Sequence, residues 1–236
     1  MKAVLLAAGR GTRISRLIEN VPKCTLPINQ KPLVRRSVEI LLSRNIEVAI
    51  CVGYQHHVIR NVLKGLDVTY YYNPFYDVTN SIGSLWLAQE FIDDDCLIMN
   101  ADVYWTEQIL NDVIADQNDV VMSIDKSRRS VGDYFFQTAN DCIKKYGKGL
   151  PLEERSGEYV GLAKVTKGFV PAFNQRMNEI VERQEHNKWW EEVLYSFTEE
   201  RDIHTLDVNG EFWAEVDYYD DYERILIYVK KEETGF

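Results

Sequence analysis

The sequence predicts an α/β protein with a mostly parallel, doubly wound sheet, and three observations lead to this expectation. Apolar, β-branched runs alternate with amphipathic stretches over residues 1–125, as in strands joined by crossover helices. A glycine-rich turn directly follows the first apolar run, and a later apolar run ends on an aspartate. Both features are typical of the edge where open α/β sheets bind ligands.

The individual elements follow from local pattern. Short apolar runs bounded by turn residues predict strands, and apolar residues recurring every three or four positions predict helices. The expected strands are 2–8, 47–52, 68–73, 96–101, 119–125, 204–208 and 212–216. The expected helices are 13–18, 33–43, 56–66, 81–92, 106–116, two pieces within 171–197, and 218–229, with loops at 22–32 and 73–80.

The alternation stops after residue 125. Residues 127–167 are polar and rich in glycine, which favours hairpins and loops, in the manner of an inserted lid. We find no internal repeat, low-complexity tract or linker that would divide the chain. Residues 1–236 are therefore expected to form a single domain.

Composition excludes several classes of protein. Hydrophobic residues make up 45% and charged residues 27% of the 236 positions, as in ordinary globular proteins. A net charge of −10 argues against general binding of nucleic acid or an anionic membrane. No apolar stretch reaches the roughly 18 residues of a membrane-spanning helix. Four cysteines and four histidines without ligand spacing fit a cytoplasmic protein that has no disulfide framework or zinc site.

The glycine-rich turn has the chemistry of a phosphate loop. Residues 6–13 read Leu-Ala-Ala-Gly-Arg-Gly-Thr-Arg, and their amide groups can cradle an anion at a helix start. The Gly-Lys-Ser/Thr ending of a Walker loop is missing, and Ile14 stands at the third glycine of the dinucleotide fingerprint. A nucleotide loop that uses Arg13 fits, and an ordinary strand-to-helix turn is the alternative.

Three further segments carry charged side chains at informative places. Residues 21–28 contain Lys23 between two prolines, which stiffen the loop that holds it. Asp102 follows an apolar strand, at the carboxyl edge of the predicted sheet. Near the end of the chain, strand alternation places Glu215 and Asp217 on one face.

One more segment, residues 80–85, reads Asn-Ser-Ile-Gly-Ser-Leu and begins a predicted helix. Ser81 is equally suited to cap that helix and to contact a ligand. Aromatic residues are also frequent, and Trp105, Trp189, Trp190, Trp213 and Tyr218 are candidates for a cage around a quaternary ammonium group. Lys144, Lys145 and Lys148 receive no role.

In this order the motifs resemble those of the sugar-phosphate and phosphocholine-type nucleotidyltransferases. Residues 6–13 match "LAAGxGxR", residues 22–27 resemble "PKxLxP", and 213–217 are similar to the acidic end of phosphocholine cytidylyltransferases. Residues 80–85 look more like the cytidylyltransferase run "NNxxSL" than the "GTAGAL" of sugar-nucleotide enzymes. The resemblance implies a Rossmann-like nucleotidyltransferase sandwich, with a mostly parallel mixed sheet and an inserted hairpin or lid region.

The resemblance also implies a reaction and a site. CTP would be joined to a small phosphomonoester, a phosphocholine-like amine or alcohol, with release of pyrophosphate. Arg13 and Lys23 would be catalytic, Asp102 and Asp217 would hold Mg²⁺, and Glu215 would contact the acceptor. The nucleotide would be bound by Leu6, Ala7, Ala8, Gly9, Gly11, Thr12, Asn80, Ser81, Ser84 and Ala101.

The same resemblance divides the chain into a nucleotide-binding part at about 1–125 and an acceptor-binding and lid part at about 126–236. The partners implied are CTP and the phosphomonoester, without nucleic acid or membrane, and the oligomeric state is left open. Two alternatives stay open. One is a sugar-1-phosphate nucleotidyltransferase, which the missing "GTA" run disfavours. The other is a non-catalytic nucleotide-binding paralogue, which the intact charged residues disfavour.

Overall fold

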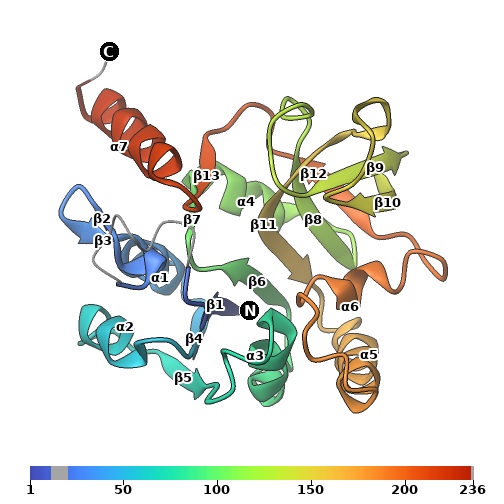
Figure 1. The fold of residues 1–236 in the computed structure, drawn as a ribbon, viewed down its shortest axis with the longest axis horizontal. Helices are drawn as coiled ribbons and strands as arrows, with labels where there is room; N and C mark the ends of the chain where they lie inside the picture. Colours follow the sequence, from blue (N-terminus) through green and yellow to red (C-terminus); the bar gives the residue numbers. More distant parts are fainter. Residues whose placement is uncertain (12–20, 235–236) are drawn as a thin grey trace.

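The computed structural model describes residues 1–11 and 21–234, and its centre is a mixed sheet (Figure 1). The order of its nine described strands is β5-β4-β1-β6-β11-β8-β12-β10-β9. Their bounds are β5 Thr69–Tyr72, β4 Glu47–Val52, β1 Lys2–Ala7, β6 Cys96–Asn100, β11 Gly157–Val165, β8 Val120–Asp125, β12 His204–Asp207, β10 Cys142–Gly147 and β9 Phe135–Ala139. The helix expected at 13–18 lies outside the described residues.

Strands β5, β4, β1 and β6 run parallel, with Leu6 of β1 level with Asn100 of β6. Because parallel strands end at a common edge, the turn after β1 and Asp102 after β6 are brought together. The expectation that both would lie at the carboxyl edge of the sheet is thus met.

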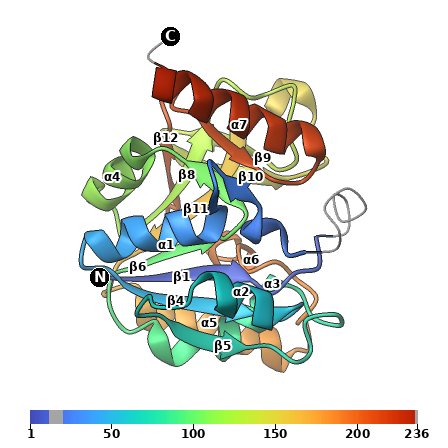
Figure 2. The same ribbon diagram turned by 90° about the vertical axis from the view of Figure 1, so that its left-hand side faces the viewer.

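Helices cover both faces of the sheet (Figure 2). The helices are α1 Leu33–Ser43, α2 His56–Val62, α3 Ser81–Leu87, α4 Glu107–Ala115, α5 Val170–Glu182, α6 Glu192–Tyr195 and α7 Tyr219–Thr234, with short 3₁₀ turns at Lys23–Thr25, Gln89–Phe91 and Leu152–Glu154. Apolar side chains of α3 and α5 pack with Val4 on one face, and those of α1, α2 and α4 pack with Ala3 and Leu5 on the other. Successive side chains of β1 thus point to opposite faces, and both faces are buried, as in a central strand of a parallel sheet.

Strand β11 corrects the expectation for 127–167. All nine of its residues are buried, and it runs antiparallel between β6 and β8 in the middle of the sheet. The sequence did not predict this strand because it contains two charged residues, Glu158 and Lys164. Both are paired in the fold: Glu158 binds Arg128, and the Lys164 ammonium donates to the carbonyls of Ile114 and Asp116. The predicted hairpin is present as β9 and β10 at the sheet edge.

The description "mostly parallel" is also wrong. Within the nine-stranded sheet of the described residues, four strand pairings are parallel and five are antiparallel. The antiparallel ones arise because β11 reverses direction beside β6 and β8 and because β9 and β10 form a hairpin. The mixed α/β character itself is confirmed.

Two small ribbons complete the fold. Strand β13 (Trp213–Glu215), which the sequence predicts, pairs antiparallel with β7 (Val103–Trp105), which it does not. The register places Glu215 opposite Val103, beside Asp102. The predicted loop 22–32 contains a short hairpin of β2 (Pro27–Ile28) and β3 (Lys31–Pro32). No described helix is both long enough and apolar enough to cross a bilayer.

Candidate active site

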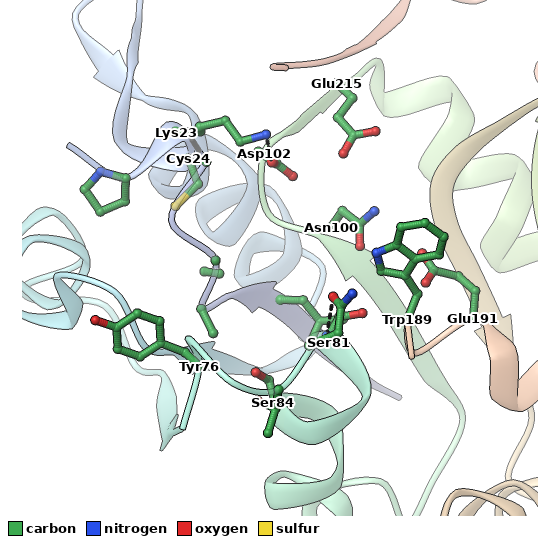
Figure 3. Close-up of a pocket in the computed structure, with 18 residues that line it drawn as sticks. Lys23, Cys24, Tyr76, Ser81, Ser84, Asn100, Asp102, Trp189, Glu191 and Glu215 are labelled. Carbon is green, nitrogen blue, oxygen red and sulfur yellow. Dashed lines mark hydrogen bonds and ion pairs between the residues drawn. The ribbon is translucent and has the colours of Figure 1, made fainter. Parts of the chain in front are cut away.

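A cavity of about 330 Å³ opens at the carboxyl edge of β1 and β6 (Figure 3). Segments from the whole length of the chain contribute to its wall. The lining residues are Leu6, Ala7, Ala8, Gly9, Gly11, Pro22, Lys23, Cys24, Tyr76, Thr79, Asn80, Ser81, Ser84, Asn100, Asp102, Trp189, Glu191 and Glu215. We call this space the nucleotide cavity.

Most of the predicted site residues line this cavity. The structure brings Leu6, Ala7, Ala8, Gly9, Gly11, Lys23, Asn80, Ser81, Ser84, Asp102 and Glu215 to its wall. Ala101 is buried behind it, where its amide donates to the carbonyl of Leu6. Asp217 is buried next to it and contacts Lys23. Thr12 and Arg13 lie outside the described residues.

Lys23 joins the two aspartates of the site. Its ammonium Nζ lies 2.9 Å from Asp102 Oδ2 and 2.6 Å from Asp217 Oδ1. Burial lowers the pKa of Lys23, but the charges of Asp102 and Asp217 outweigh it and hold the pKa above its ordinary value. The lysine is therefore a fixed positive charge at the floor of the cavity.

The backbone around this charge is shaped to admit it. Gly11 has a φ of +60°, and a Cβ there would come within 2.5 Å of Lys23 Cγ. A side chain at this position would strain the backbone and displace the lysine. The second glycine of the turn therefore leaves space for the Lys23 side chain, in addition to the phosphate role that the sequence predicts for it. On the other side, Asp221 at the start of α7 accepts from the amides of Asp217 and Tyr218 and fixes the chain that carries Asp217.

Glu215 is the third acid at this floor. It ends β13 and lines the cavity close to Asp102, as Figure 3 shows. Burial and the neighbouring charges of Asp102 and Asp217 raise its pKa well above the ordinary range. An acid in this position favours the arrival of a cation, because a positive charge relieves the repulsion among the three carboxyl groups.

The start of α3 forms another wall. Asn80, and not Ser81, caps this helix, because the Asn80 side chain accepts from the Ser81 amide. The Ser81 hydroxyl accepts instead from the amide of Trp190 at 2.9 Å. The buried Ser84 hydroxyl accepts from Asn73 at 3.0 Å. The segment 80–84 thus fastens two loops to the cavity wall.

Sequence reasoning missed Asn100 and Glu191. Asn100 ends β6, and its side chain accepts from the indole of Trp190 at 3.3 Å. Glu191 is buried, and burial raises its pKa to about 8. The available signal was the run Trp189-Trp190-Glu191, in which an acid directly follows two aromatic residues.

The tryptophans divide between core and site. Trp190 is fully buried, and Trp105 and Trp213 are also in the core. Trp189 is 39% exposed and lines the nucleotide cavity. Tyr218 lies outside this cavity, so Trp189 is the one of the five proposed cage residues that reaches its wall.

A second, smaller cavity of about 110 Å³ continues from the first. The two share the residues Asn100, Trp189, Glu191 and Glu215. The rest of the smaller wall is made by Asp133, Tyr134, Lys148, Glu158, Tyr159 and Tyr195. We call this space the acceptor cavity, after the acceptor contact that the sequence predicts for Glu215. Its wall is dominated by carboxyl groups and aromatic rings.

A family model and two named relatives match most of this chain. The family model described as the MobA-like NTP transferase domain matches residues 3–196. The chain is 25% identical to the CTP:phosphoglutamine cytidylyltransferase of Campylobacter jejuni, with 94% of this chain and 98% of the relative covered. It is 26% identical to the choline-phosphate cytidylyltransferase of Haemophilus influenzae, with 96% of each covered.

Solved structures share the fold. The CTP:phosphocholine cytidylyltransferase of Streptococcus pneumoniae matches with a TM-score of 0.81 at 22% identity, covering 97% of this chain and 98% of the other. A UDP-glucose pyrophosphorylase complexed with UDP-glucose matches with a TM-score of 0.76 at 16% identity, covering 98% of each. The family match over most of its length shows that the chain belongs to the MobA-like NTP transferase domain family.

Proposed function

We propose that this protein is a cytidylyltransferase that joins CTP to a small phosphorylated amine or alcohol and releases pyrophosphate. The observation that carries the proposal is the contact of Lys23 with Asp102 and Asp217 at the floor of a cavity built on the glycine-rich turn. The two relatives named cytidylyltransferases, each covered over nearly their whole length, support the choice of CTP.

The chemistry asks the protein mainly to bring anions together. A phosphate oxygen of the acceptor attacks the α-phosphorus of CTP, and pyrophosphate leaves. That oxygen is already ionised near neutral pH, because the second pKa of a phosphomonoester is about 6. The site therefore needs no strong general base, and catalysis rests on positioning and charge neutralisation. Lys23 supplies positive charge at the reacting phosphate, and the turn at 7–11 supplies backbone amides.

The two aspartates fit a hard divalent cation. One ammonium already lies within 3 Å of a carboxylate oxygen from each, so the pair defines a cation position. The described residues contain no group of three or more His, Cys, Asp or Glu side chains arranged to hold a metal. Mg²⁺ at Asp102 and Asp217 would complete its shell with water and phosphate oxygens, as it commonly does. When bound, Mg²⁺ would supply charge neutralisation, and Lys23 would be released from the aspartates to the phosphates.

The remaining assignments belong to the same proposal. Arg13 grips the β- or γ-phosphate, Asn80, Ser81 and Ser84 face the nucleotide, and Glu215 faces the acceptor. Residues 1–236 act as one cytoplasmic domain, with the nucleotide mainly on 1–125 and the acceptor mainly on 126–236. The hairpin of β9 and β10 acts as the lid of the acceptor side, and Lys148, which directly follows β10, supports this by lining the acceptor cavity.

A pyrophosphate-release screen tests the proposal. CTP, UTP, dTTP, ATP and GTP are each paired with phosphocholine, phosphoethanolamine, aminoethylphosphonate, polyol phosphates and sugar-1-phosphates. We expect the highest kcat/KM for CTP with an amine-bearing acceptor. Highest activity with UTP or dTTP and a hexose-1-phosphate would instead make the protein a sugar-nucleotide enzyme. No release from any pair would support a non-catalytic paralogue.

A further inference from the structure

The acceptor cavity already contains a positive charge. The Lys148 ammonium lies 4.9 Å from the ring centroid of Trp189 and 2.7 Å from Asp133 Oδ2. It is the one lysine or arginine among the described residues that line this cavity. The aromatic face that would attract a quaternary ammonium group is thus occupied by a lysine of the protein.

The fold places this lysine at the cavity. Lys148 directly follows β10, and the preceding Gly147 has a φ of +133°, which turns the chain where a larger side chain would be strained. One residue earlier, Tyr146 stacks on Tyr195 with ring centroids 4.3 Å apart, and Tyr195 is itself part of the cavity wall. The stacking anchors the end of β10 beside the cavity, so Lys148 differs from a lysine on an unconstrained loop.

Two acids lie where the two cavities meet. Glu191 and Glu215 line both cavities, whereas Lys148 lines only the acceptor cavity. Glu158 is held by Arg128 at 2.5 Å and by the Asp133 amide at 2.8 Å, so its charge is already balanced. The acceptor cavity therefore offers carboxyl groups at its junction with the nucleotide cavity, and it offers one ammonium, that of Lys148, which is paired with Asp133.

We propose that Lys148 determines acceptor specificity by binding a carboxylate, and that the acceptor is accordingly a phosphorylated compound with a zwitterionic, amino-acid-like head. The ammonium of that head faces Glu191 and Glu215, and its carboxylate faces Lys148. A quaternary ammonium head without a carboxylate places a second cation beside Lys148 and offers the lysine no carboxylate beyond that of Asp133. This inference rests on the proposed function and names the substrate class of the same site.

Two acceptors that differ by one carboxylate test the inference. O-phosphohomoserine has the zwitterionic head, and 3-aminopropyl phosphate is the same molecule without the carboxylate. We expect the wild type to prefer O-phosphohomoserine in kcat/KM by about 10- to 100-fold, the range of a charge-assisted hydrogen bond. Lys148→Met should remove this preference by lowering only the O-phosphohomoserine value, and Lys148→Arg should keep most of it.

Lys145→Met is the matched control. Lys145 lies on β10, three residues before Lys148. It is exposed and pairs with Glu154 at 2.8 Å, outside the acceptor cavity. This variant should retain the wild-type preference. If the wild type prefers 3-aminopropyl phosphate or phosphocholine, or if Lys148→Met lowers both acceptors equally, the inference is wrong.

Calorimetric binding of O-phosphohomoserine separates the two levels of the argument. Loss of binding in Lys148→Met but not in Lys145→Met supports the inference even if no nucleotide is turned over, and in that case only the proposed reaction fails. Equal binding by wild type and Lys148→Met overturns the inference whatever the reaction. Matching thermal unfolding curves of the variants exclude misfolding as the cause.

Discussion

The two cavities of the active site are built in different ways. The nucleotide cavity takes much of its wall from contiguous stretches, residues 6–11, 22–24 and 79–84, in which backbone conformation and glycine matter as much as side chains. The acceptor cavity takes single residues or short pairs from seven separate places between 100 and 215. The first can be recognised as motifs along the sequence, whereas the second exists only after the sheet has formed. On the proposed function, the chemistry shared with relatives would depend on the motifs, and acceptor selectivity would depend on the wall that the fold assembles.

The largest expected effect comes from replacing the two aspartates beside the nucleotide cavity. Asp102→Asn and Asp217→Asn should each lower kcat by orders of magnitude with any acceptor, because each removes a proposed ligand of Mg²⁺. Steady-state pyrophosphate release measures this, and wild-type activity should vanish with EDTA and return with Mg²⁺. Asp220→Asn, at an exposed position of the same helix start, is the control. Full activity after EDTA would contradict the two-aspartate site.

Replacing Lys23 tests stability together with rate. Lys23→Met leaves Asp102 and Asp217 without the ammonium that joins them, so the free energy of unfolding should fall by about 3 kcal/mol, as when one partner of a buried ion pair is lost. Urea unfolding with and without Mg²⁺ measures this, and Mg²⁺ should restore part of the loss. Lys31→Met removes an exposed ion pair with Glu39 and should have little effect. A Lys23 variant as stable as the wild type would show that the ion pairs do not stabilise the site.

These residues also show which parts of the site could be predicted from the sequence. Lys23, Asp102 and Asp217 could be predicted because stiff, contiguous motifs carry them to one sheet edge. Strand β11 could not, because Glu158 and Lys164 make it look polar, and only the fold reveals that Arg128 and two backbone carbonyls compensate them. The sequence also did not predict Glu191 and Lys148 as site residues, because the residues around them come from strands and loops that are distant in the chain.

A buried hydrogen bond joins the strand that carries Glu215 to the end of β8. Trp213 Nε1 donates to Asp125 Oδ2 at 2.8 Å, and both residues are buried. Trp213→Phe should lower the free energy of unfolding by about 1–3 kcal/mol, because it removes the indole donor from the buried Oδ2, while Oδ1 keeps its bonds from Ser127. Trp86→Phe removes a bond of equal length to Asn178 at an exposed site and should have a much smaller effect in the same urea titration. Equal losses in the two variants would argue against the role of burial.

The last expected effect is a pH dependence of stability at the boundary of the two cavities. The carboxyl of Glu191 titrates near 4.5 in ordinary surroundings, and burial raises its pKa to about 8 in the fold. Between these values the folded state holds one more proton than the unfolded state, so this group makes wild-type stability fall as pH rises. Glu191→Gln lacks the titration, and its stability relative to the wild type should therefore increase from about pH 5 to about pH 8.

Chemical unfolding at several pH values measures the difference, and the exposed Glu199→Gln should show no such trend. A constant difference between Glu191→Gln and the wild type would mean that Glu191 titrates alike in the folded and unfolded chain.

The position of β11 has a consequence for the order in which the chain can assemble at the ribosome. Strand β6 is complete at residue 100, but its partner on one side is made only at 157–165. Until then, an apolar strand in the middle of the future sheet has an open edge, and such edges invite pairing with other chains. While the ribosome synthesises the segment between β6 and β11, the free edge of β6 therefore remains open. We expect a nascent chain to be most prone to misassembly during this period.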